Sequence, residues 1–382
     1  LIADVQNKVM VGNEIYQFFT AGPDNRDKYA ALALQYSPRL RILTDDKITY
    51  DIPVAINLDK DYNLTNNKAY LDKSTTKELT PTVYWDVLES ESHYFIHYTW
   101  YFVGRASVDP EYQNDASGAL VVVEKWGDKR PVELLSWSKN DVGEFIEAFA
   151  TTESGLSTGA LYVTETHAQA DLFPSGHPEI AIVSHVHESC PWISPGRPGV
   201  CNLPLGGRTK YVGLTLVLDG GVTATPFKKT GSAWPKNNKD LTGTDDGLAS
   251  YALVDMIDGW WPRRTQITTV FYDSYKTLNY TDAGKTKTAK FPRNFLNADG
   301  TDSPGRVPWA VTWDPEDGSA FKDNMPAGEY FIDSAANIQS RHGGAYVTTA
   351  FDEVTKAGFS TVWCLNPYFD VDHRGETDVC PD

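Results

Sequence analysis

The stretch "HYFIHYTWYF", residues 93–102, decides the fold, because it reads as a long β-strand. Successive side chains of a strand point to opposite faces of a sheet, so the stretch divides into two sets. Aromatic and β-branched residues fill both sets, which favours a strand over a helix. The first set is Tyr94, Ile96, Tyr98, Trp100 and Phe102, and the second is His93, Phe95, His97, Thr99 and Tyr101.

Similar strand patterns recur along the chain, separated by clusters of Gly, Asn, Asp and Pro. We therefore predict a mainly β protein, a β-rich α+β fold built on a large β-sandwich with peripheral helices and long loops. Further strands are predicted at 118–126, 160–166, 179–186, 211–218, 265–273, 328–333 and 360–365. Helices are predicted at 27–36, 140–150, 245–256 and 350–358, where apolar residues recur at helical spacing or a glycine marks a helix end.

The chain has 382 residues, of which 41% are hydrophobic, enough for a large core. We predict an N-terminal extension at 1–25 and a single large sandwich domain at 26–382, with an insertion around 222–262. No internal repeat interrupts this arrangement.

The charge balance narrows the classes of partner. The net charge is -17, from 34 basic and 51 acidic residues. Nucleic-acid binding needs clustered Lys and Arg, so this balance argues against it. Adsorption on anionic membranes is disfavoured for the same reason, and no apolar run is long enough for a transmembrane segment. A neutral glycan or a neutral lipid surface fits the composition, as do cations.

Three features together indicate a secreted, extracellular protein. The chain begins "LIADVQNKVM" rather than with Met, as a processed form would. Asn63 and Asn279 each open an N-glycosylation sequon. The four cysteines form two local couples, for which short-range disulfides are the simplest of three possible connectivities. The couples are Cys190 with Cys201 and Cys364 with Cys380.

The run "DPEYQNDASG", residues 109–118, precedes the apolar strand that begins at Leu120. Its carboxylate, Asp115, has two interpretations. It is either part of a binding site or a turn residue that bonds nearby backbone amides before the strand. Because Asn and Asp before a strand usually serve a turn, we favour the second interpretation.

Several phrases of the chain, taken in order, resemble the vacuolar protein sorting 62-related family. The resemblance extends over roughly residues 28–370, and it includes a distant similarity to the necrosis- and ethylene-inducing cytolysins. It implies a β-sandwich in which a "GHRHDWE" loop beside a central strand lines a divalent-cation pocket. The phrases are "LALQYSPRLRILTDDKITYDIPV" (32–54), "HYFIHYTWYF" (93–102), "QNDASGALVVV" (113–123), "GHPEIAIVSHVHES" (176–189), "VPWAVTWDPEDG" (307–318) and "CLNPYFD" (364–370).

The cation ligands of that family carry over poorly to this chain. Where the sorting 62-related family has histidine, glutamate, aspartate and glutamate, this chain has Tyr112, Gln113, Asp115 and Ser117. A hard cation needs several oxygen donors, and one carboxylate with an amide and a hydroxyl makes a weak cage. The resemblance therefore supports the fold and argues against the family's metal site at this position.

Histidines provide a different candidate site. His185 and His187 are separated by one residue in a predicted strand, so both would point to the same face. With a third donor, they could hold zinc or another transition metal. The third donor would be His167, His93 or His97, and Glu165 would act as a ligand or general base. The alternative is that these histidines bond to backbone carbonyls.

Asp370 and Asp372, in "DVDHRG", imitate the start of a calcium loop and keep a glycine at its sixth position. The twelfth position lacks glutamate, so these residues are otherwise turn acids. The cofactor expected from all candidates is a divalent metal (Ca, Mg or Zn) or none.

Aromatic residues in loops suggest a surface for recognition, because their rings stack on sugars or lie at lipid interfaces. Trp192, between two cysteines, and Trp260, in "DGWWPRR", are the best candidates for ligand binding, with Asp115 as a third. We predict a toxin-like protein that binds a cell surface, a glycan or a lipid. One alternative is a metal-dependent hydrolase using His185 and His187. Another is a family member that has lost its site and acts as a structural or inhibitory protein.

Overall fold

The computed structural model describes most of the chain. The described residues are 7–11, 14–18, 26–43, 48–73, 78–105, 112–126, 131–139, 145–151, 177–184, 187–194, 197–198, 212–217, 224–228, 234–235, 237–242, 248–263, 270, 275–282, 285–292, 294–307, 332–341, 345–369 and 371–373.

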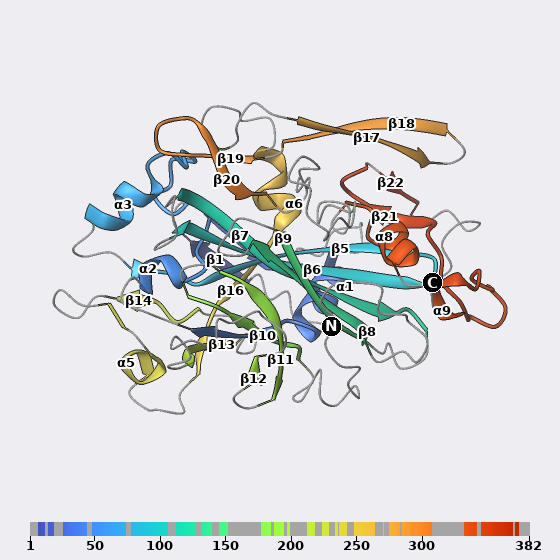
Figure 1. Cartoon of the computed structure of the whole chain (residues 1–382), viewed down its shortest axis with the longest axis horizontal. Coiled ribbons are helices and arrows are strands. Elements are labelled where there is room, and N and C mark those ends of the chain that lie inside the picture. Colours follow the sequence, from blue (N-terminus) through green and yellow to red (C-terminus); the bar gives the residue numbers. More distant parts are fainter. Residues whose placement is uncertain are drawn as a thin grey trace.

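A large, mostly antiparallel sheet forms the centre of the molecule (Figure 1). Its strand order is β22-β21-β5-β6-β7-β8-β9, and β16 joins β5 in parallel. The prediction of a mainly β fold is therefore confirmed. The strands are β5 (Thr82–Ser90), β6 (His93–Arg105), β7 (Tyr112–Glu124), β8 (Pro131–Lys139), β9 (Phe145–Thr151), β16 (Ala252–Asp255), β21 (Trp363–Asn366) and β22 (Val371–Asp372).

A second sheet has the order β12-β11-β10-β3-β13-β15. Its middle strand, β3, pairs in parallel with β10 and antiparallel with β13, so residues distant in sequence build its centre. The strands are β3 (Arg39–Leu43), β10 (Glu179–Ile182), β11 (Ser189–Ser194), β12 (Arg197–Pro198), β13 (Val212–Val217) and β15 (Ala249–Ser250).

Both faces of β6 are covered, which explains why aromatic side chains occur in both of its side-chain sets. On one face, Tyr98 Oη donates to the Ala33 carbonyl at 2.7 Å, and Trp100 Nε1 donates to Ser189 Oγ at 3.2 Å. The first sheet therefore meets α1 (Arg26–Gln35) and β11 on this side. On the other face, Phe95 packs edge-on against Phe359. Every residue of β6 is buried as a result.

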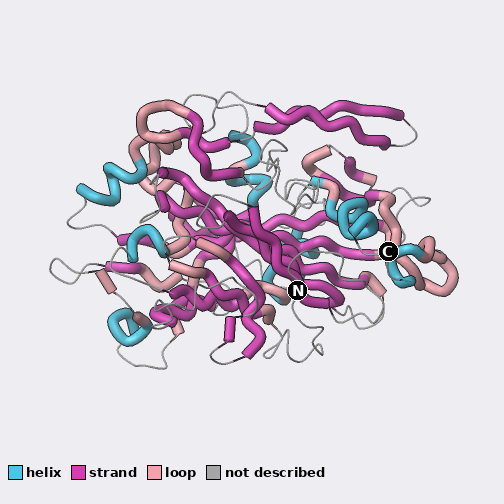
Figure 2. Tube along the Cα trace, in the orientation of Figure 1, coloured by secondary structure: helices cyan, strands magenta, loops and turns pink. Residues whose placement is uncertain are grey.

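Helices are short and lie around the sheets, as Figure 2 shows. None of them, in the described part of the chain, has the length and apolar character needed to cross a membrane. They are α1, α2 (Ile48–Asp51), α3 (Asn67–Lys73), α5 (Asn238–Thr242), α6 (Met256–Gly259), the 3-10 turn η1 (Trp261–Arg263), α8 (Ser334–Arg341) and α9 (Ala345–Thr348).

Small two-stranded units complete the structure. The hairpin of β17 and β18 lies along one edge of the molecule in Figure 1. Within the predicted extension at 1–25, β1 pairs with β2, while the predicted insertion at 222–262 supplies β15 and β16 to the two sheets. The pairs are β1 (Asn7–Val11) with β2 (Glu14–Phe18), β4 (Glu78–Leu79) with β14 (Phe227–Lys228), β17 (Tyr275–Asp282) with β18 (Lys285–Pro292), and β19 (Asn294–Leu296) with β20 (Asp302–Arg306).

Three of the four predicted helices are wrong, and only the one at 27–36 is confirmed, as α1. The segment 140–150 contains β9, because the neighbouring edge of β8 offers backbone partners along its length. The segment 245–256 contains β15 and β16, which complete the two sheets. The segment 350–358 forms a narrow loop closed by bridges, and its Gly358 has φ 92°. Pairing in the sheets outweighs helical spacing in the first two, and isolated bridges close the third as a loop.

The predicted strands agree better with the structure than the predicted helices do. Those at 93–102, 118–126 and 211–218 correspond to β6, β7 and β13, and the strand at 360–365 overlaps β21. The strand predicted at 179–186 ends early, at Ile182. The segment 160–166 lies outside the described residues, and of 265–273 and 328–333 the structure describes only Val270, Ile332 and Asp333, none of them in a strand.

Candidate functional site

The candidate site lies between the two sheets, on the face of β7 that β11 covers. Asp115 is in β7, opposite Phe102 of β6, and is 2% exposed. Its interpretation as a turn residue before the strand is therefore wrong. β7 begins at Tyr112, and its polar residues alternate, with Gln113, Asp115 and Ser117 on one face.

His187 approaches Asp115 from the connection between β10 and β11. Its Nδ1 atom lies 3.0 Å from Asp115 Oδ2, and its ring stacks on Phe102 with the centroids 3.7 Å apart and the planes 7° apart. The backbone of His187 is left-handed, with φ 53°, and its N–H donates to the Val183 carbonyl at 2.9 Å. The prediction that His187 belongs to a strand shared with His185 is thus wrong, and His185 lies outside the described residues.

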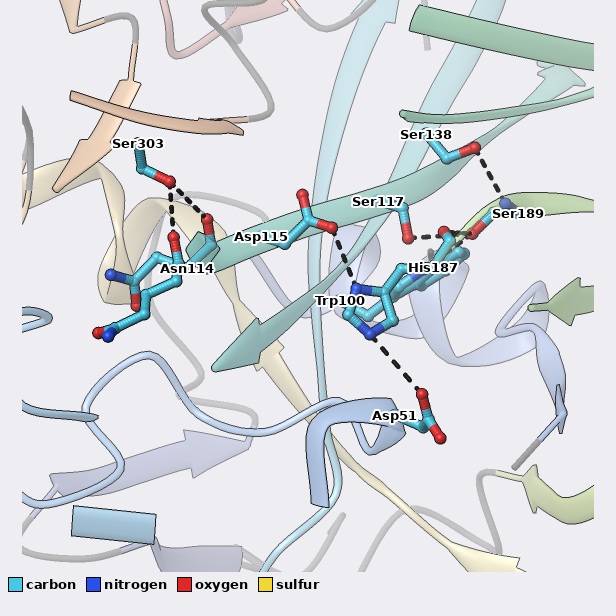
Figure 3. A network of polar contacts seen from close by, with 10 residues as sticks. Asp51, Trp100, Asn114, Asp115, Ser117, Ser138, His187, Ser189 and Ser303 are labelled. Carbon is cyan, nitrogen blue, oxygen red and sulfur yellow. Dashed lines mark hydrogen bonds and ion pairs between the residues drawn. The ribbon is translucent and has the colours of Figure 1, made fainter. Parts of the chain in front are cut away.

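A second carboxylate faces the other side of the same ring. Asp51, the last residue of α2, is fully buried, and its Oδ1 atom lies 3.9 Å from His187 Nε2. Figure 3 shows the imidazole between Asp115 and Asp51. The sequence contains no local signal for this arrangement, because the three residues come from separate parts of the chain.

A layer of serines beside this group joins the two sheets (Figure 3). Ser189 Oγ donates to Ser117 Oγ at 3.0 Å, and the Ser189 N–H donates to Ser138 Oγ at 3.0 Å. Ser136 Oγ donates to the Ser189 carbonyl at 2.8 Å. These buried hydroxyls satisfy one another and fix β11 on the first sheet.

Asn114, next to Asp115, points to the opposite face of β7 and has a structural role. Its amide nitrogen donates to the carbonyls of Leu64 and Leu296, and its oxygen accepts a hydrogen bond from Tyr101 Oη. Ser303 Oγ donates to the Gln113 carbonyl at 2.6 Å. These contacts hold β19 and β20 against β7.

His97 lies on the face of the sheet opposite His187. Its Nδ1 atom is 2.7 Å from Asp86 Oδ1, and its Nε2 atom is 3.0 Å from Ser334 Oγ. Tyr368 Oη donates to Asp86 Oδ2 at 2.8 Å. The order of serine, histidine and aspartate is that of a catalytic triad. Ser334, however, is 0% exposed, so this chain of hydrogen bonds holds α8 on the sheet.

His93 is in a third environment, at the end of the same strand. Its Nδ1 atom bonds to Ser92 Oγ at 2.7 Å, and its ring lies against Phe359. Burial, together with the positive charge of Lys125, lowers the pKa of His93 to about 3. The predicted convergence of His187 with His93 or His97 is therefore wrong, since the sheet separates them.

Among the described residues, no group of three His, Cys, Asp or Glu side chains converges on a metal position. His167, Glu165 and Asp370 lie outside this part of the chain, while Asp372 is exposed in β22. The cation pocket that the resemblance implies does not fit here either. The imidazole of His187 fills the space between the two carboxylates, and Gln113 and Ser117 provide no charge.

The proposed recognition residues have mixed outcomes. Trp260 is 0% exposed and packs on Tyr84, Tyr101 and Phe295, so its predicted role in surface recognition is wrong. The backbone of Trp192 pairs with Pro198 across β11 and β12, and its side chain lies outside the described part. Trp260 differs from the prediction because "GWWP" forms a tight helical turn that points its side chain into the core.

The predicted disulfides and glycosylation sites lie partly outside the described residues. Cys364 is buried and disulfide-bonded, but Cys201 and Cys380 lie outside the described residues, so both predicted pairings stay predictions. Asn279 is exposed in β17, and Asn63 is half-buried in a turn where its Oδ1 atom accepts from Thr65. Glycosylation also stays a prediction.

Comparison with known proteins gives only weak likenesses. No family model matches the chain, and no curated protein matches it, so the sorting 62-related resemblance stays a prediction. Among solved structures, one described as "Toxin fold for microbial attack and plant defense" is similar at 16% identity, with a TM-score of 0.30 over 46% of this chain and 74% of that one. "NLPPya in complex with mannosamine" has 17% identity and a TM-score of 0.28 over the same shares. Likeness at this level carries no argument about function.

Proposed function

We propose that this protein is secreted and toxin-like, and that it recognises a neutral cell-surface glycan or lipid instead of turning over a substrate at His187. The observation that carries the proposal is the separation of the candidate histidines. His93, His97 and His187 are each buried, each bonded to a different partner, and divided between two faces of one sheet. A hydrolytic site needs such groups to converge on a substrate.

A surface feature at one end of the large sheet supports recognition. Val354 is 92% exposed at the tip of the loop at 350–358. Hydrogen bonds define the shape of the loop: Asp352 Oδ1 accepts from the N–H groups of Val354 and Thr355, and the Asp352 carbonyl accepts from the Lys356 N–H. A hydrogen-bonded loop that holds an apolar side chain in water suggests a contact surface.

Aromatic and apolar groups accompany Val354 at this end. Lys356 Nζ lies 4.1 Å from the centroid of the Trp126 ring, and Val362 is 47% exposed near the turn between β5 and β6. We call Trp126, Val354, Lys356 and Val362 the loop-tip surface. The Lys356 ammonium group over the half-buried Trp126 ring adds a polar group beside the exposed Val354 and Val362, a combination that suits an uncharged lipid or glycan surface.

Binding to neutral phosphatidylcholine vesicles and to an array of neutral glycans tests this proposal. We expect one of the two to be bound, and Val354→Asp to weaken that binding about tenfold or more, because burial of a valine contributes roughly 1.5–3 kcal/mol. Leu248→Asp is the matched control, since Leu248 is also exposed but precedes β15, away from the loop-tip surface.

Two outcomes would overturn the proposal. The first is absence of binding in both assays, which favours the structural or inhibitory alternative. The second is hydrolysis of a test substrate that metal addition restores after chelation, which favours the metal-dependent hydrolase predicted at His185 and His187. Equal losses in Val354→Asp and Leu248→Asp would remove the loop-tip surface from the proposal.

A further inference from the structure

Two arginines of β3 lie on the face of the second sheet that is turned away from the core. Arg39 and Arg41 are separated by one residue, so their side chains share a face. Leu40 and Ile42 take the other face and are fully buried. The side chains of Arg39 and Arg41 are 26% and 25% exposed, so this face of β3 is open to a charged solute.

One carboxylate bonds to both guanidinium groups. Glu179 of β10 pairs with Arg39 in the parallel register of the two strands, and its side chain is 4% exposed. Glu179 Oε1 accepts a hydrogen bond from Arg39 Nη1 at 2.9 Å, and Glu179 Oε2 accepts one from Arg41 Nε at 2.5 Å. A carboxylate that is removed from water needs such partners, so Glu179 fixes the positions of both guanidinium groups.

The charges of these three side chains do not cancel. Two guanidinium groups carry two positive charges, because arginine stays protonated in proteins, and Glu179 supplies one negative charge. Just before the two strands, His177 Nδ1 lies 2.9 Å from the Ser37 carbonyl oxygen, and this residue adds no negative charge. Arg39, Arg41 and Glu179 together thus carry one net positive charge, on a chain whose net charge is -17.

The guanidinium group of Arg39 has a second edge besides the one that meets Glu179. Its contact with Glu179 is made by Nη1, and its buried Nε atom has no hydrogen-bond partner among the described residues. Nε and Nη2 form the side-on edge of a guanidinium group, a pair of parallel N–H donors that fits two oxygens of an oxyanion. A buried N–H group without an acceptor is unfavourable, and an oxyanion bound at this edge would satisfy it.

We propose that Arg39 and Arg41 form a binding site for a tetrahedral oxyanion, a phosphate or sulfate group, on the outer face of β3. Arg39 donates from its side-on edge to two oxygens of the group, and Glu179 holds both arginines in place. A tetrahedral oxyanion has a further oxygen that faces the charge of Arg41, which a carboxylate lacks. The inference goes beyond the proposed function, and the loop-tip surface has no part in it.

Nuclear magnetic resonance of the full chain, labelled with nitrogen-15 at arginine, tests the site with inorganic phosphate at constant ionic strength. We expect the Nε–H signal of Arg39 to shift and to saturate, with a dissociation constant on the order of 1–10 mM. Arg263 is the internal control and should show no saturable shift. It is half-buried, and its Cζ atom lies 3.6 Å from the centroid of the Tyr62 ring. An Arg39 signal that stays unchanged, or that moves only in parallel with that of Arg263, overturns the proposal.

Two variants separate an oxyanion site from an ion pair that only joins β3 to β10. Arg39→Gln identifies the Arg39 signal by its absence and should lose phosphate binding, measured as broadening of the phosphorus-31 line of phosphate. Arg39→Lys keeps a positive charge beside Glu179 but has no planar pair of donors, so we expect binding to weaken about tenfold. Wild-type affinity in either variant overturns the proposal. If Arg39→Gln does not fold, Arg39→Lys decides.

A second probe distinguishes the source of the oxyanion. Glycerol 3-phosphate carries the phosphate group as an ester, as a lipid headgroup does, whereas inorganic phosphate is the free ion. Tighter binding of the ester indicates a site for phosphate esters, and tighter binding of inorganic phosphate indicates a site for the free ion. Absence of binding for both probes overturns the proposal and leaves the loop-tip surface unaffected.

Discussion

Single residues of β7 show how closely the interior is packed. Gly118 lies opposite Trp137 of β8 and, on its other side, opposite Thr99 of β6. A Cβ atom at this position would stand 2.5 Å from the Tyr98 carbonyl oxygen and 2.6 Å from Trp137 Nε1. Neither neighbour is at the end of a flexible side chain, so β7 needs a glycine where it passes between the two strands.

Gly118→Ala should therefore destabilise the protein by about 2–3 kcal/mol, because an added methyl group forces the surrounding strands apart. Urea unfolding followed by tryptophan fluorescence measures the change. Gly300→Ala is the comparison: its φ is 78° and its surroundings are open, so only the backbone penalty of about 1 kcal/mol applies. A loss at Gly118 no greater than at Gly300 would show that β6 and β8 yield easily.

At the scale of elements, α8 depends on a polar chain that begins in the large sheet. Asp86 on β5 and His97 on β6 are cross-strand neighbours, and Ser334 opens α8. The three hydrogen bonds among Tyr368, Asp86, His97 and Ser334 join the C-terminal elements to the centre of the sheet.

Ser334→Ala should lower the free energy of unfolding by roughly 1–2 kcal/mol, since it removes one buried hydrogen bond to His97. Chemical denaturation provides the measurement. Lys285→Ala, on an exposed position of β18, should change stability by less than about 0.5 kcal/mol. A loss at Ser334 no larger than at Lys285 would contradict an anchoring role for this hydroxyl.

The central strands of the fold could be predicted from the sequence, because the run of aromatic and β-branched residues in β6 is long and continuous. The helices at 140–150 and 245–256 could not be excluded, since apolar residues three and four apart also occur in buried strands. What decides between them is the free edge of a neighbouring strand, such as β8 for β9, and that edge is a tertiary feature.

Asp115 and His187 could be selected from the sequence, but their partnership could not. Both faces of β7 are buried around Asp115, so its polar residues do not alternate with apolar ones as they would in a strand with one face in water. In the sequence, such a polar run therefore resembles a turn. Asp51 carries no local pattern at all. Its role follows from α2 meeting the connection after β10, a contact between distant segments.

For the whole molecule, buried titratable groups determine how stability varies with pH. His93 is buried with a pKa lowered to about 3, so the folded state does not take up the proton that the unfolded state binds below about pH 6.5. Stability from this group is present above pH 6.5 and is lost as the pH falls towards 3. Asp59 acts in the opposite sense, because burial and Asp61 raise its pKa to about 6.

Unfolding free energies measured from pH 7 to pH 3.5 should therefore fall more steeply in wild type than in His93→Phe, which keeps a ring against Phe359 but does not titrate. The lowered pKa corresponds to a difference of roughly 4 kcal/mol between the two ends of this range. Parallel curves for the two proteins would mean that His93 is not the group responsible.

The position of β3 in the middle of the second sheet has a consequence for synthesis on the ribosome. β3 ends at Leu43, whereas its partners β10 and β13 end at Ile182 and Val217. At ~5–20 residues per second, translation needs roughly 10–35 s to pass from β3 to the end of β13. During that interval the nascent chain exposes β3 without its full set of neighbours, so that Leu40 and Ile42, which are buried in the folded sheet, are available to a chaperone that binds extended segments.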